Sequence, residues 1–393
     1  MRIAVFVDDI RAETGGGYTF QEDVLAGLFQ TVGSSHHSFV IYGRVANEFR
    51  APNLEFRRVK WKSTKTGDWL RACFPCVDLL CNSLGWCSKI ERDLRRNNVS
   101  CVWFLAPTYQ TTETPYVCTI WDLQHRKQPW FPEVSEKGRW YFREAGYARV
   151  LARATAILTP NHVGKDEVVF LYGVPPERVL TVPHPTPAFA QRQDNHRWPE
   201  VAARHGVPER FLLYPAQFWA HKNHCNLLAA LRLLLSRDGL RVPVVLVGSD
   251  KGNLKHVLSV ARSYGLEKQV HHLGFIPQED LILLYQNALA LTYLTFFGPE
   301  NLPPLEAFAL GCPVVASRVA GADSQFADCA RLVDPTDVEE IATAIKEVCF
   351  QESVRSELVR RGMTRAEQWT AVHYVQAVLK FFDDFERVRR CWA

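Results

Sequence analysis

Residues 3–7 read Ile-Ala-Val-Phe-Val, the run Gly15-Gly16-Gly17 follows, and apolar positions within 24–29 then recur at helical spacing. A buried strand, a glycine turn and a helix in this order open a doubly wound α/β sheet. The pattern continues with strand candidates at residues 38–42, 101–105, 116–121, 156–159 and 179–182. Because helical stretches lie between them, the sequence predicts parallel strands joined by crossover helices.

A second alternation of the same kind starts near residue 210. Its strand candidates are residues 211–214, 244–248, 270–273, 288–294 and 313–317. We therefore expect the α/β class, with two Rossmann-like doubly wound domains facing across a cleft. The expected boundaries are an N-terminal domain at 1–185, a polar linker at 186–209, a second domain at 210–370 and a terminal helix at 371–393.

Length and composition narrow the class of protein. The 393 residues exceed the ~250–300 that one hydrophobic core usually serves, which favours two domains. Hydrophobic residues make up 47% and charged residues 22%, so the composition is that of a globular protein and excludes disorder. No apolar run approaches the ~20 residues of a membrane span. The apolar run at the start of the sequence ends at Asp8 and Asp9, which makes it too short for a secretory signal. We therefore expect a cytoplasmic protein.

The 11 cysteines do not form a clear metal motif. Cys73, Cys76, Cys81 and Cys87 are clustered, but they are not two paired Cys-x-x-Cys units and no histidine lies among them. Zinc sites normally use such paired spacings. We expect reduced, buried thiols and no metal ligands.

The most informative segment is residues 298–317, Gly-Pro-Glu-Asn-Leu-Pro-Pro-Leu-Glu-Ala-Phe-Ala-Leu-Gly-Cys-Pro-Val-Val-Ala-Ser. It predicts a loop, a helix with Glu306 in its first turn, and a buried strand. The start of such a helix attracts phosphate or sugar oxygens through its backbone N–H groups. Two roles remain open for Glu306, which either accepts ligand hydroxyls or only complements the helix dipole.

This segment resembles glycosyltransferase family 4, the glycosyl transferases group 1, whose members have the GT-B fold and use nucleotide-diphosphate sugars. The resemblance implies that Glu306 binds the ribose hydroxyls. The first Glu of the family's Glu-x7-Glu motif is replaced by Gly298. Glu300, two residues on, either substitutes for it at the donor sugar or is a bystander. The backbone amides of Asn301 and Leu302 are expected to face the sugar.

Two further segments resemble the same family. In residues 214–224, Lys222 matches a family Lys that contacts the donor diphosphate, while Gln217 occupies the position of a family Arg. In residues 115–125, Trp121 stands where the family has a His near the reaction centre, and Asp122 and His125 follow it. A strand-end Asp with a nearby His suits gripping a hydroxyl or moving a proton. A loop-capping Asp122 is the alternative.

Weaker matches extend the resemblance over nearly the whole chain. Gly16 and Gly17 match the glycine-rich turn that approaches donor phosphate or acceptor, and Gly248 matches a glycine at a second-domain strand end. Phe275 falls in a segment similar to the family's nucleobase-binding loop. The resemblance also implies that the helix at 371–393 crosses back to the first domain.

Residues 56–74 mix six Lys/Arg with one Asp and several aromatic side chains. Cations interleaved with aromatics suit an anionic membrane surface, and a solvated loop with inward aromatics is the alternative. A sequence pI near 8.4 and the lack of a nucleic-acid motif argue against nucleic-acid binding.

The resemblance implies that the protein is a retaining glycosyltransferase. It would move a sugar from a nucleotide-diphosphate sugar to a glycan or lipid-linked acceptor, in cell-surface polysaccharide or lipopolysaccharide synthesis. We expect no cofactor besides the donor, no metal, and a cytoplasmic protein with peripheral contact at the inner face of the membrane. One alternative is a catalytically silent GT-B protein that acts as a binding or scaffold subunit. The other is a nucleotide-sugar epimerase, and Trp121 and Gly298 argue against this second alternative.

Overall fold

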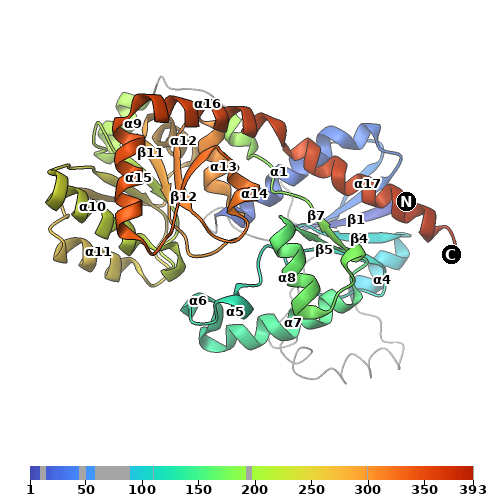
Figure 1. The fold of residues 1–393 in the computed structure, drawn as a ribbon. Helices are drawn as coiled ribbons and strands as arrows, with labels where there is room; N and C mark the ends of the chain where they lie inside the picture. The colour runs from blue at the N-terminus through green and yellow to red at the C-terminus, as the bar shows by residue number, and fades with distance from the viewer. Residues whose placement is uncertain are drawn as a thin grey trace. The chain divides into compact units, whose positions relative to one another are not determined.

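The computed structural model describes residues 1–8, 15–43, 50–57, 89–108, 110–191, 197–298 and 300–392. By their contacts these residues form two compact units (Figure 1). Unit 1 contains the first strand, the described residues from Gly17 to Pro183, and the segment from Ala371 onward. Unit 2 contains His184 to Thr370 together with Gly15 and Gly16.

Unit 1 is built on a 7-stranded sheet in the order β3-β2-β1-β4-β5-β6-β7, and every neighbouring pair is parallel. The strands are β1 (Arg2–Phe6), β2 (Ser38–Tyr42), β3 (Leu54–Arg57), β4 (Cys101–Phe104), β5 (Tyr116–Thr119), β6 (Ala156–Thr159) and β7 (Val179–Thr181). All four residues of β4, β5 and β6 are buried. Since successive side chains point to opposite faces, both faces of the sheet are covered.

The helices of unit 1 connect these parallel strands. They are α1 (Gly16–Thr31), η2 (Val32–Ser34), α4 (Lys89–Arg96), α5 (Gln124–Lys127), α6 (Pro132–Ser135), η3 (Glu136–Gly138), α7 (Arg139–Arg153), α8 (His162–Tyr172), η4 (Pro176–Arg178) and α17 (Ala371–Arg389). The terminal helix α17 packs within unit 1, with Phe382 against Trp103 and Tyr374 against Phe20. At Gly27 a side chain would meet the Ala371 carbonyl oxygen at 2.5 Å, so α1 and α17 approach closely there.

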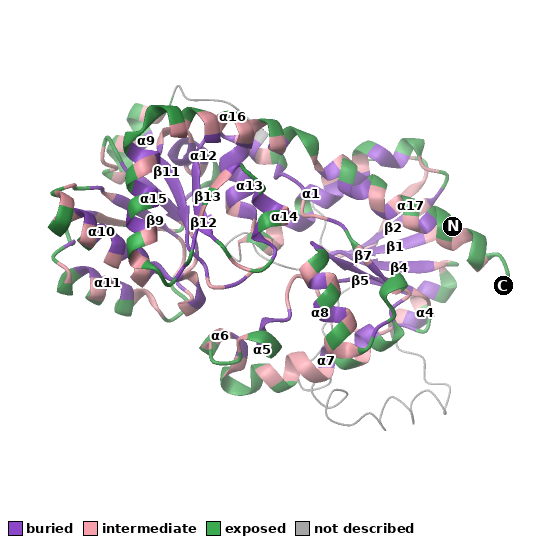
Figure 2. Ribbon diagram, viewed as in Figure 1, coloured by how far each residue is buried: buried purple, intermediate pink, exposed green. Residues whose placement is uncertain are grey.

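Unit 2 repeats the architecture with a 6-stranded parallel sheet in the order β10-β9-β8-β11-β12-β13. The strands are β8 (Leu212–Pro215), β9 (Val244–Val247), β10 (Val270–Gly274), β11 (Ala290–Tyr293), β12 (Val314–Ser317) and β13 (Ala330–Val333). The runs Val-Val-Leu-Val in β9 and Val-Val-Ala-Ser in β12 are wholly buried, as Figure 2 shows for the sheet. Such unbroken apolar runs are typical of central parallel strands.

The helices of unit 2 cover this sheet. They are η5 (Ala188–Gln191), α9 (Trp198–His205), η6 (Ala220–Lys222), α10 (His224–Asp238), α11 (Leu254–Ser263), α12 (Gln278–Asn287), α13 (Leu302–Ala309), α14 (Ala322–Phe326), α15 (Val338–Phe350) and α16 (Glu352–Gln368). Helix α13 packs on β11, β12 and α16, and α15 packs on α10.

The expected α/β class with two doubly wound sheets is confirmed. Strands at 38–42 and 156–159 have the predicted bounds, whereas the short edge strands β3 and β13 were not anticipated. The segment 186–209, expected to be a linker, contains η5 and α9. His205 at the end of α9 lies with Nε2 2.8 Å from Asp280 Oδ2 of α12, which fastens α9 to unit 2.

Two predicted regions lie largely outside the described residues. These are the basic segment 56–74, of which only Phe56 and Arg57 are described, and the cluster of Cys73, Cys76, Cys81 and Cys87. Phe56 packs against Phe29 at 6.0 Å between ring centroids. Among the described residues, none of the helices combines the length and the hydropathy that a bilayer crossing needs.

Candidate functional site

The winding of unit 2 reverses between β8 and β11, which are hydrogen-bonded neighbours in the middle of the sheet. Ligands of doubly wound sheets bind beyond the carboxyl ends of the strands at such a point. The loop of residues 216–223 leaves β8 there, and the loop that leads from β11 to α13 leaves beside it. Both segments that carry the family resemblance in this half of the chain therefore meet at one edge of the sheet.

Lys222 lies at the end of η6, in the loop that follows β8. Its Nζ donates a hydrogen bond of 2.7 Å to the hydroxyl of Tyr293, the last residue of β11. Nζ also lies 4.9 Å from the centroid of the Tyr293 ring. The tyrosine hydroxyl in turn donates to Asn301 Oδ1 at 3.2 Å. A half-buried cation is thus held at the switch point by the side chain that ends the neighbouring strand.

Helix α13 starts directly after Asn301, and this start is fixed by Gln325. The Asn301 N–H donates to Gln325 Oε1 at 3.1 Å, and Gln325 Nε2 donates to the Asn301 carbonyl at 2.5 Å. Prolines follow at the second and third helical positions and carry no N–H. Of the first three helical residues only Leu302 has a backbone donor. That the Asn301 and Leu302 amides face the sugar stays a prediction, and in this structure the Asn301 amide donates to Gln325.

Glu306 lies in the second turn of α13, not in the first turn as predicted, because the helix starts at Leu302. Its side chain is buried, and Oε2 accepts a hydrogen bond of 2.7 Å from the hydroxyl of Tyr285 in α12. Burial raises the pKa of Glu306 to about 7, against the opposing effect of the Tyr285 hydrogen bond. Because a carboxylate accepts about four hydrogen bonds, Glu306 keeps the capacity to accept hydroxyls from a ligand.

Glu300 is buried and faces His184, which begins unit 2 after β7. Its Oε2 accepts a hydrogen bond of 2.6 Å from the backbone N–H of His184. Burial raises the pKa of Glu300 to about 8 and lowers the pKa of His184 to about 4. Both groups are therefore uncharged near neutral pH. The role of Glu300 at a donor sugar stays a prediction, and its present contact fastens a main-chain segment.

The two other predicted residues of this edge follow β9 and β10. Gly248 has φ +147°, and a side chain there would lie 2.4 Å from the Ala216 carbonyl oxygen. Its N–H donates to the Gly274 carbonyl at 2.8 Å, so the glycine permits close packing of the loops after β8, β9 and β10. Phe275 follows β10 and is 56% exposed, which leaves its ring available to a ligand.

In unit 1, Asp122 follows β5 and is tied to Arg143 of α7. Its Oδ1 accepts hydrogen bonds from Arg143 at 2.8 Å and from the Gln124 N–H at 2.9 Å. Burial alone would raise the pKa of Asp122, but the Arg143 charge and these hydrogen bonds outweigh it and hold the pKa below its ordinary value. Asp122 is therefore an ionised acceptor that also caps its loop.

His125 has no solvent-exposed side-chain surface. Its Nε2 lies 3.2 Å from both Glu144 Oε2 and the Tyr172 hydroxyl, and burial lowers its pKa to about 4. The proton-moving role predicted for His125 is untested, and the contacts are those of a neutral side chain packed in the core. Gly15 has φ +86° and precedes α1, in which Gly16 and Gly17 are the first two residues.

Comparison with known proteins finds a family model that matches part of the chain. Residues 200–365 match the family model described as Glycosyl transferases group 1. This part of the chain is similar to the group 1 glycosyltransferases. The chain is 28% identical over 240 residues to the O-antigen chain mannosyltransferase B of Escherichia coli, covering 61% of this chain and 63% of that protein. It is 24% identical over 234 residues to the serotype-specific mannosyltransferase WbdA of Escherichia coli, covering 58% and 29%. The chain thus spans less than two thirds of either relative.

Solved structures confirm the expected GT-B fold. WaaG, a glycosyltransferase involved in lipopolysaccharide biosynthesis, superposes with a TM-score of 0.68 at 16% identity, covering 96% of this chain and 98% of WaaG. Anabaena Alr3699/HepE in complex with UDP and glucose also gives a TM-score of 0.68, at 14% identity, covering 98% and 100%. At these identities the likeness concerns the fold alone.

One departure from the family pattern has a clear structural counterpart. Gly298 occupies the position of the first Glu in the family motif, and its φ is +120°. A Cβ at this residue would lie 2.8 Å from the side-chain oxygen and nitrogen of Asn301. The Asn301 amide also donates to the Gly298 carbonyl at 3.1 Å. A glutamate at position 298 would therefore require the Asn301 side chain to move and would strain the backbone at this φ.

The residues at the other two departures, Gln217 and Trp121, each contact an aromatic side chain. Gln217, at the position of the family Arg, accepts a hydrogen bond of 2.9 Å from Trp219 Nε1. Lys251 Nζ lies 5.9 Å from the centroid of the Trp219 ring, so a cation remains close to this position. Trp121, at the position of the family His, packs edge-on against Phe20 at 5.9 Å.

The sequence analysis missed Tyr293, Tyr285 and Gln325, which hold Lys222, Glu306 and the start of α13. One signal for Tyr293 was present, because it is a polar side chain at the carboxyl end of a predicted central strand. Tyr285 and Gln325 come from α12 and α14, and their distances along the chain gave no indication of these contacts.

Proposed function

We propose that this protein is a retaining glycosyltransferase that transfers a sugar from a nucleoside-diphosphate sugar to a glycan or lipid-linked acceptor. The observation that carries the proposal is the Lys222–Tyr293–Asn301 chain of hydrogen bonds beside Glu306 at the switch point of unit 2. At this edge of the sheet, Lys222 provides a positioned cation for a diphosphate, and Glu306 provides a buried carboxylate for hydroxyl groups. The names of the relatives favour a mannosyl group and a role in cell-surface polysaccharide synthesis.

In the proposed mechanism, Glu306 accepts hydrogen bonds from the ribose hydroxyls of the donor. Negative charge grows on the diphosphate as its bond to the anomeric carbon breaks, and the Lys222 ammonium stabilises that charge. Tyr293 keeps Nζ in place, so little rearrangement is needed during the reaction. Asp122 orients the acceptor hydroxyl, and the departing phosphate takes its proton as the new glycosidic bond forms on the same face of the sugar.

The proposal places the protein in the cytoplasm, where nucleotide sugars are made, with peripheral contact at the inner face of the membrane. The basic segment 56–74 is the proposed contact. Its cations and aromatic residues match the chemistry of an anionic lipid surface. No part of the proposed reaction depends on this contact.

The decisive experiment measures the thermal midpoint with UDP, GDP, ADP and their sugar conjugates. A ligand that binds only the folded protein raises the midpoint according to its affinity. We expect a shift with one nucleotide, which Glu306→Ala abolishes and the control Glu279→Ala, at an exposed carboxyl of α12, leaves intact. Shifts that persist in Glu306→Ala would remove Glu306 from the donor site. No shift with any nucleotide would favour a silent GT-B binding subunit.

A further inference from the structure

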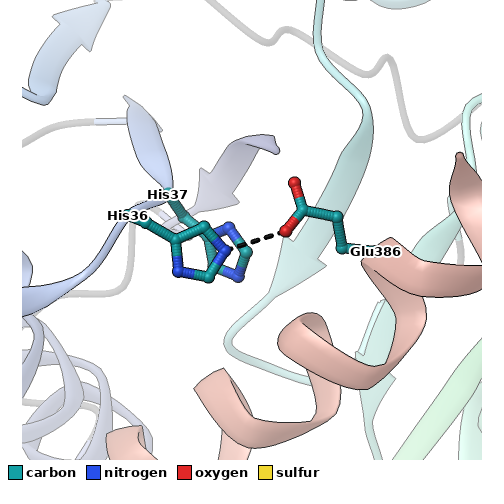
Figure 3. Close-up of side chains that lie close together, drawn as sticks. All are labelled: His36, His37 and Glu386. Atoms are coloured by element: carbon teal, nitrogen blue, oxygen red, sulfur yellow. Dashed lines mark hydrogen bonds and ion pairs between the residues drawn. The ribbon is translucent and has the colours of Figure 1, made fainter.

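A cluster of imidazole and carboxylate groups lies in unit 1, outside the proposed donor site (Figure 3). His36 and His37 occupy the turn that leads into β2, and Asp383 and Glu386 lie on α17. Residues three apart on a helix lie on the same face, so both carboxylates are directed to the same turn. The cluster therefore joins a segment near the start of the chain to the last helix.

The distances within the cluster are short. His36 Nε2 lies 2.8 Å from Glu386 Oε2 and 3.8 Å from Asp383 Oδ1, and His37 Nε2 lies 3.1 Å from Asp383 Oδ1. One ligand atom each from His36, His37 and Glu386 lie within 4.8 Å of one another. Around a tetrahedral Zn²⁺ with bonds of ~2.0–2.2 Å, ligand atoms are about 3.3–3.6 Å apart. Small side-chain movements would bring this set to that spacing.

His37 provides a second observation about this cluster, because its buried Nε2 contacts Asp383 Oδ1 without making a hydrogen bond. Its side chain is 1% exposed, and its Nε2 makes no hydrogen bond to any group that the structure describes. The nitrogen is nevertheless directed toward Asp383 Oδ1. The Met1 ammonium lies 3.0 Å from the other ring nitrogen, Nδ1, and donates to Glu386 Oε1 at 2.9 Å. The Arg390 guanidinium lies 3.7 Å from Glu386 Oε2, so a metal ion would compete with two cations for this carboxylate. A buried polar atom without a hydrogen bond is costly unless something else satisfies it.

We propose that His36, His37, Asp383 and Glu386 form a binding site for a divalent transition metal, with Zn²⁺ as the best match. Two imidazoles and two carboxylates make a mixed nitrogen and oxygen set, which suits Zn²⁺ and other late first-row ions, whereas Mg²⁺ and Ca²⁺ prefer oxygen ligands alone. The ion would satisfy the buried nitrogen of His37 and fasten α17 to the turn before β2. The site is independent of the proposed transferase reaction.

The test uses the full chain without a polyhistidine tag, stripped of metal with EDTA and then titrated with Co²⁺. Four nitrogen and oxygen ligands should give one equivalent of bound Co²⁺ with the visible absorption of a tetrahedral site, and Zn²⁺ should remove that absorption. His36→Ala and Glu386→Gln should each weaken binding at least tenfold. Zn²⁺ should raise the thermal midpoint of the wild-type protein and have little effect on either variant.

Matched controls come from the same helix. His373→Ala and Asp384→Asn change exposed residues of α17 outside the cluster and should bind Co²⁺ as the wild type does. Circular dichroism checks that every variant is folded. The proposal is overturned if no saturable site appears, or if folded His36→Ala and Glu386→Gln both bind with unchanged affinity. A sulfur-to-cobalt charge-transfer band would also overturn it, because thiolates would then hold the metal.

Discussion

Replacing Glu300 with glutamine tests whether this carboxyl is protonated in the folded protein. Glutamine has nearly the same shape, is uncharged at every pH, and keeps an oxygen that can accept the hydrogen bond from the His184 N–H. In the wild-type protein, burial raises the pKa of Glu300 to about 8 from the ordinary value of 4.5. The variant therefore mimics the protonated form and removes the titration.

The sign and size of the effect follow from the two pKa values. Between pH 4.5 and about 8 the folded state holds a proton that the unfolded state has released. The contribution of Glu300 to stability is thus fully present below pH 4.5 and is lost as the pH rises through about 8. The slope approaches ~1.4 kcal/mol per pH unit, so roughly 2–3 kcal/mol is lost between pH 5 and pH 7.

The assay is urea unfolding of wild-type protein and Glu300→Gln at pH 5, 6, 7 and 8. We expect similar stability at pH 5 and a growing advantage of the variant at higher pH. Glu306 also has a raised pKa, but it is present in both proteins and cancels in the difference. As a control, the exposed Glu279 of α12 is replaced by glutamine, and the stability of this variant should change with pH as that of the wild type does. Parallel profiles for Glu300→Gln would show that Glu300 is ionised in the folded state, and would refute the reasoning.

Three further predictions concern the donor edge of unit 2. Lys222→Ala should lower turnover at least tenfold, a loss of ~1.4 kcal/mol of transition-state stabilisation, and normal steady-state kinetics would exclude Lys222 from the mechanism. Tyr293→Phe removes the hydroxyl that accepts from Nζ at 2.7 Å. It should lower kcat about tenfold, since a hydrogen bond to a charged group is worth ~1.5–3 kcal/mol, and an unchanged kcat would deny that Tyr293 positions Lys222. Gly298→Ala should cost ~1–3 kcal/mol in urea unfolding, clearly more than Gly239→Ala, whose site has φ +67° and open space. Equal costs at the two glycines would contradict the clash with Asn301.

The sheets could be predicted from the sequence because central parallel strands are buried on both faces. The Val-Val-Leu-Val run of β9 and the Val-Val-Ala run at 314–316 in β12 then stand out as unbroken apolar segments. The edge strands β3 and β13 are only partly buried along most of their length and carry charged residues, so they lack that signal. The start of α13 was predicted too late, with Glu306 in the first turn, because the prolines were assigned to the preceding loop, although proline is favoured in a first helical turn.

The candidate site was predictable only in part. The loops that carry Lys222 and Glu306 follow strands at a topological switch point, and that rule needs only the strand order. Which side chains hold them depends on α12, α14 and the end of β11, and no local pattern reports such contacts. His125 shows the opposite kind of error that sequence reasoning can make. In the sequence, a His near a strand-end Asp suggests a reactive group, whereas in the structure His125 is buried against Glu144 and Tyr172.

The departures at Gly298 and Gln217 are better explained by a rebuilt loop than by decay of an unused site. A decayed site would leave Lys222 and Asn301 without specific partners, yet both are joined through the Tyr293 hydroxyl. The Asn301 side chain also lies within 2.8 Å of where a Cβ at position 298 would be, so the missing Glu and the Asn301 contacts belong to one arrangement. If so, Gly298→Glu alone should not improve turnover, because the new carboxylate cannot fit while Asn301 stays. A gain in activity from that single change would show that the loop can rearrange and that the site had merely lost its first Glu.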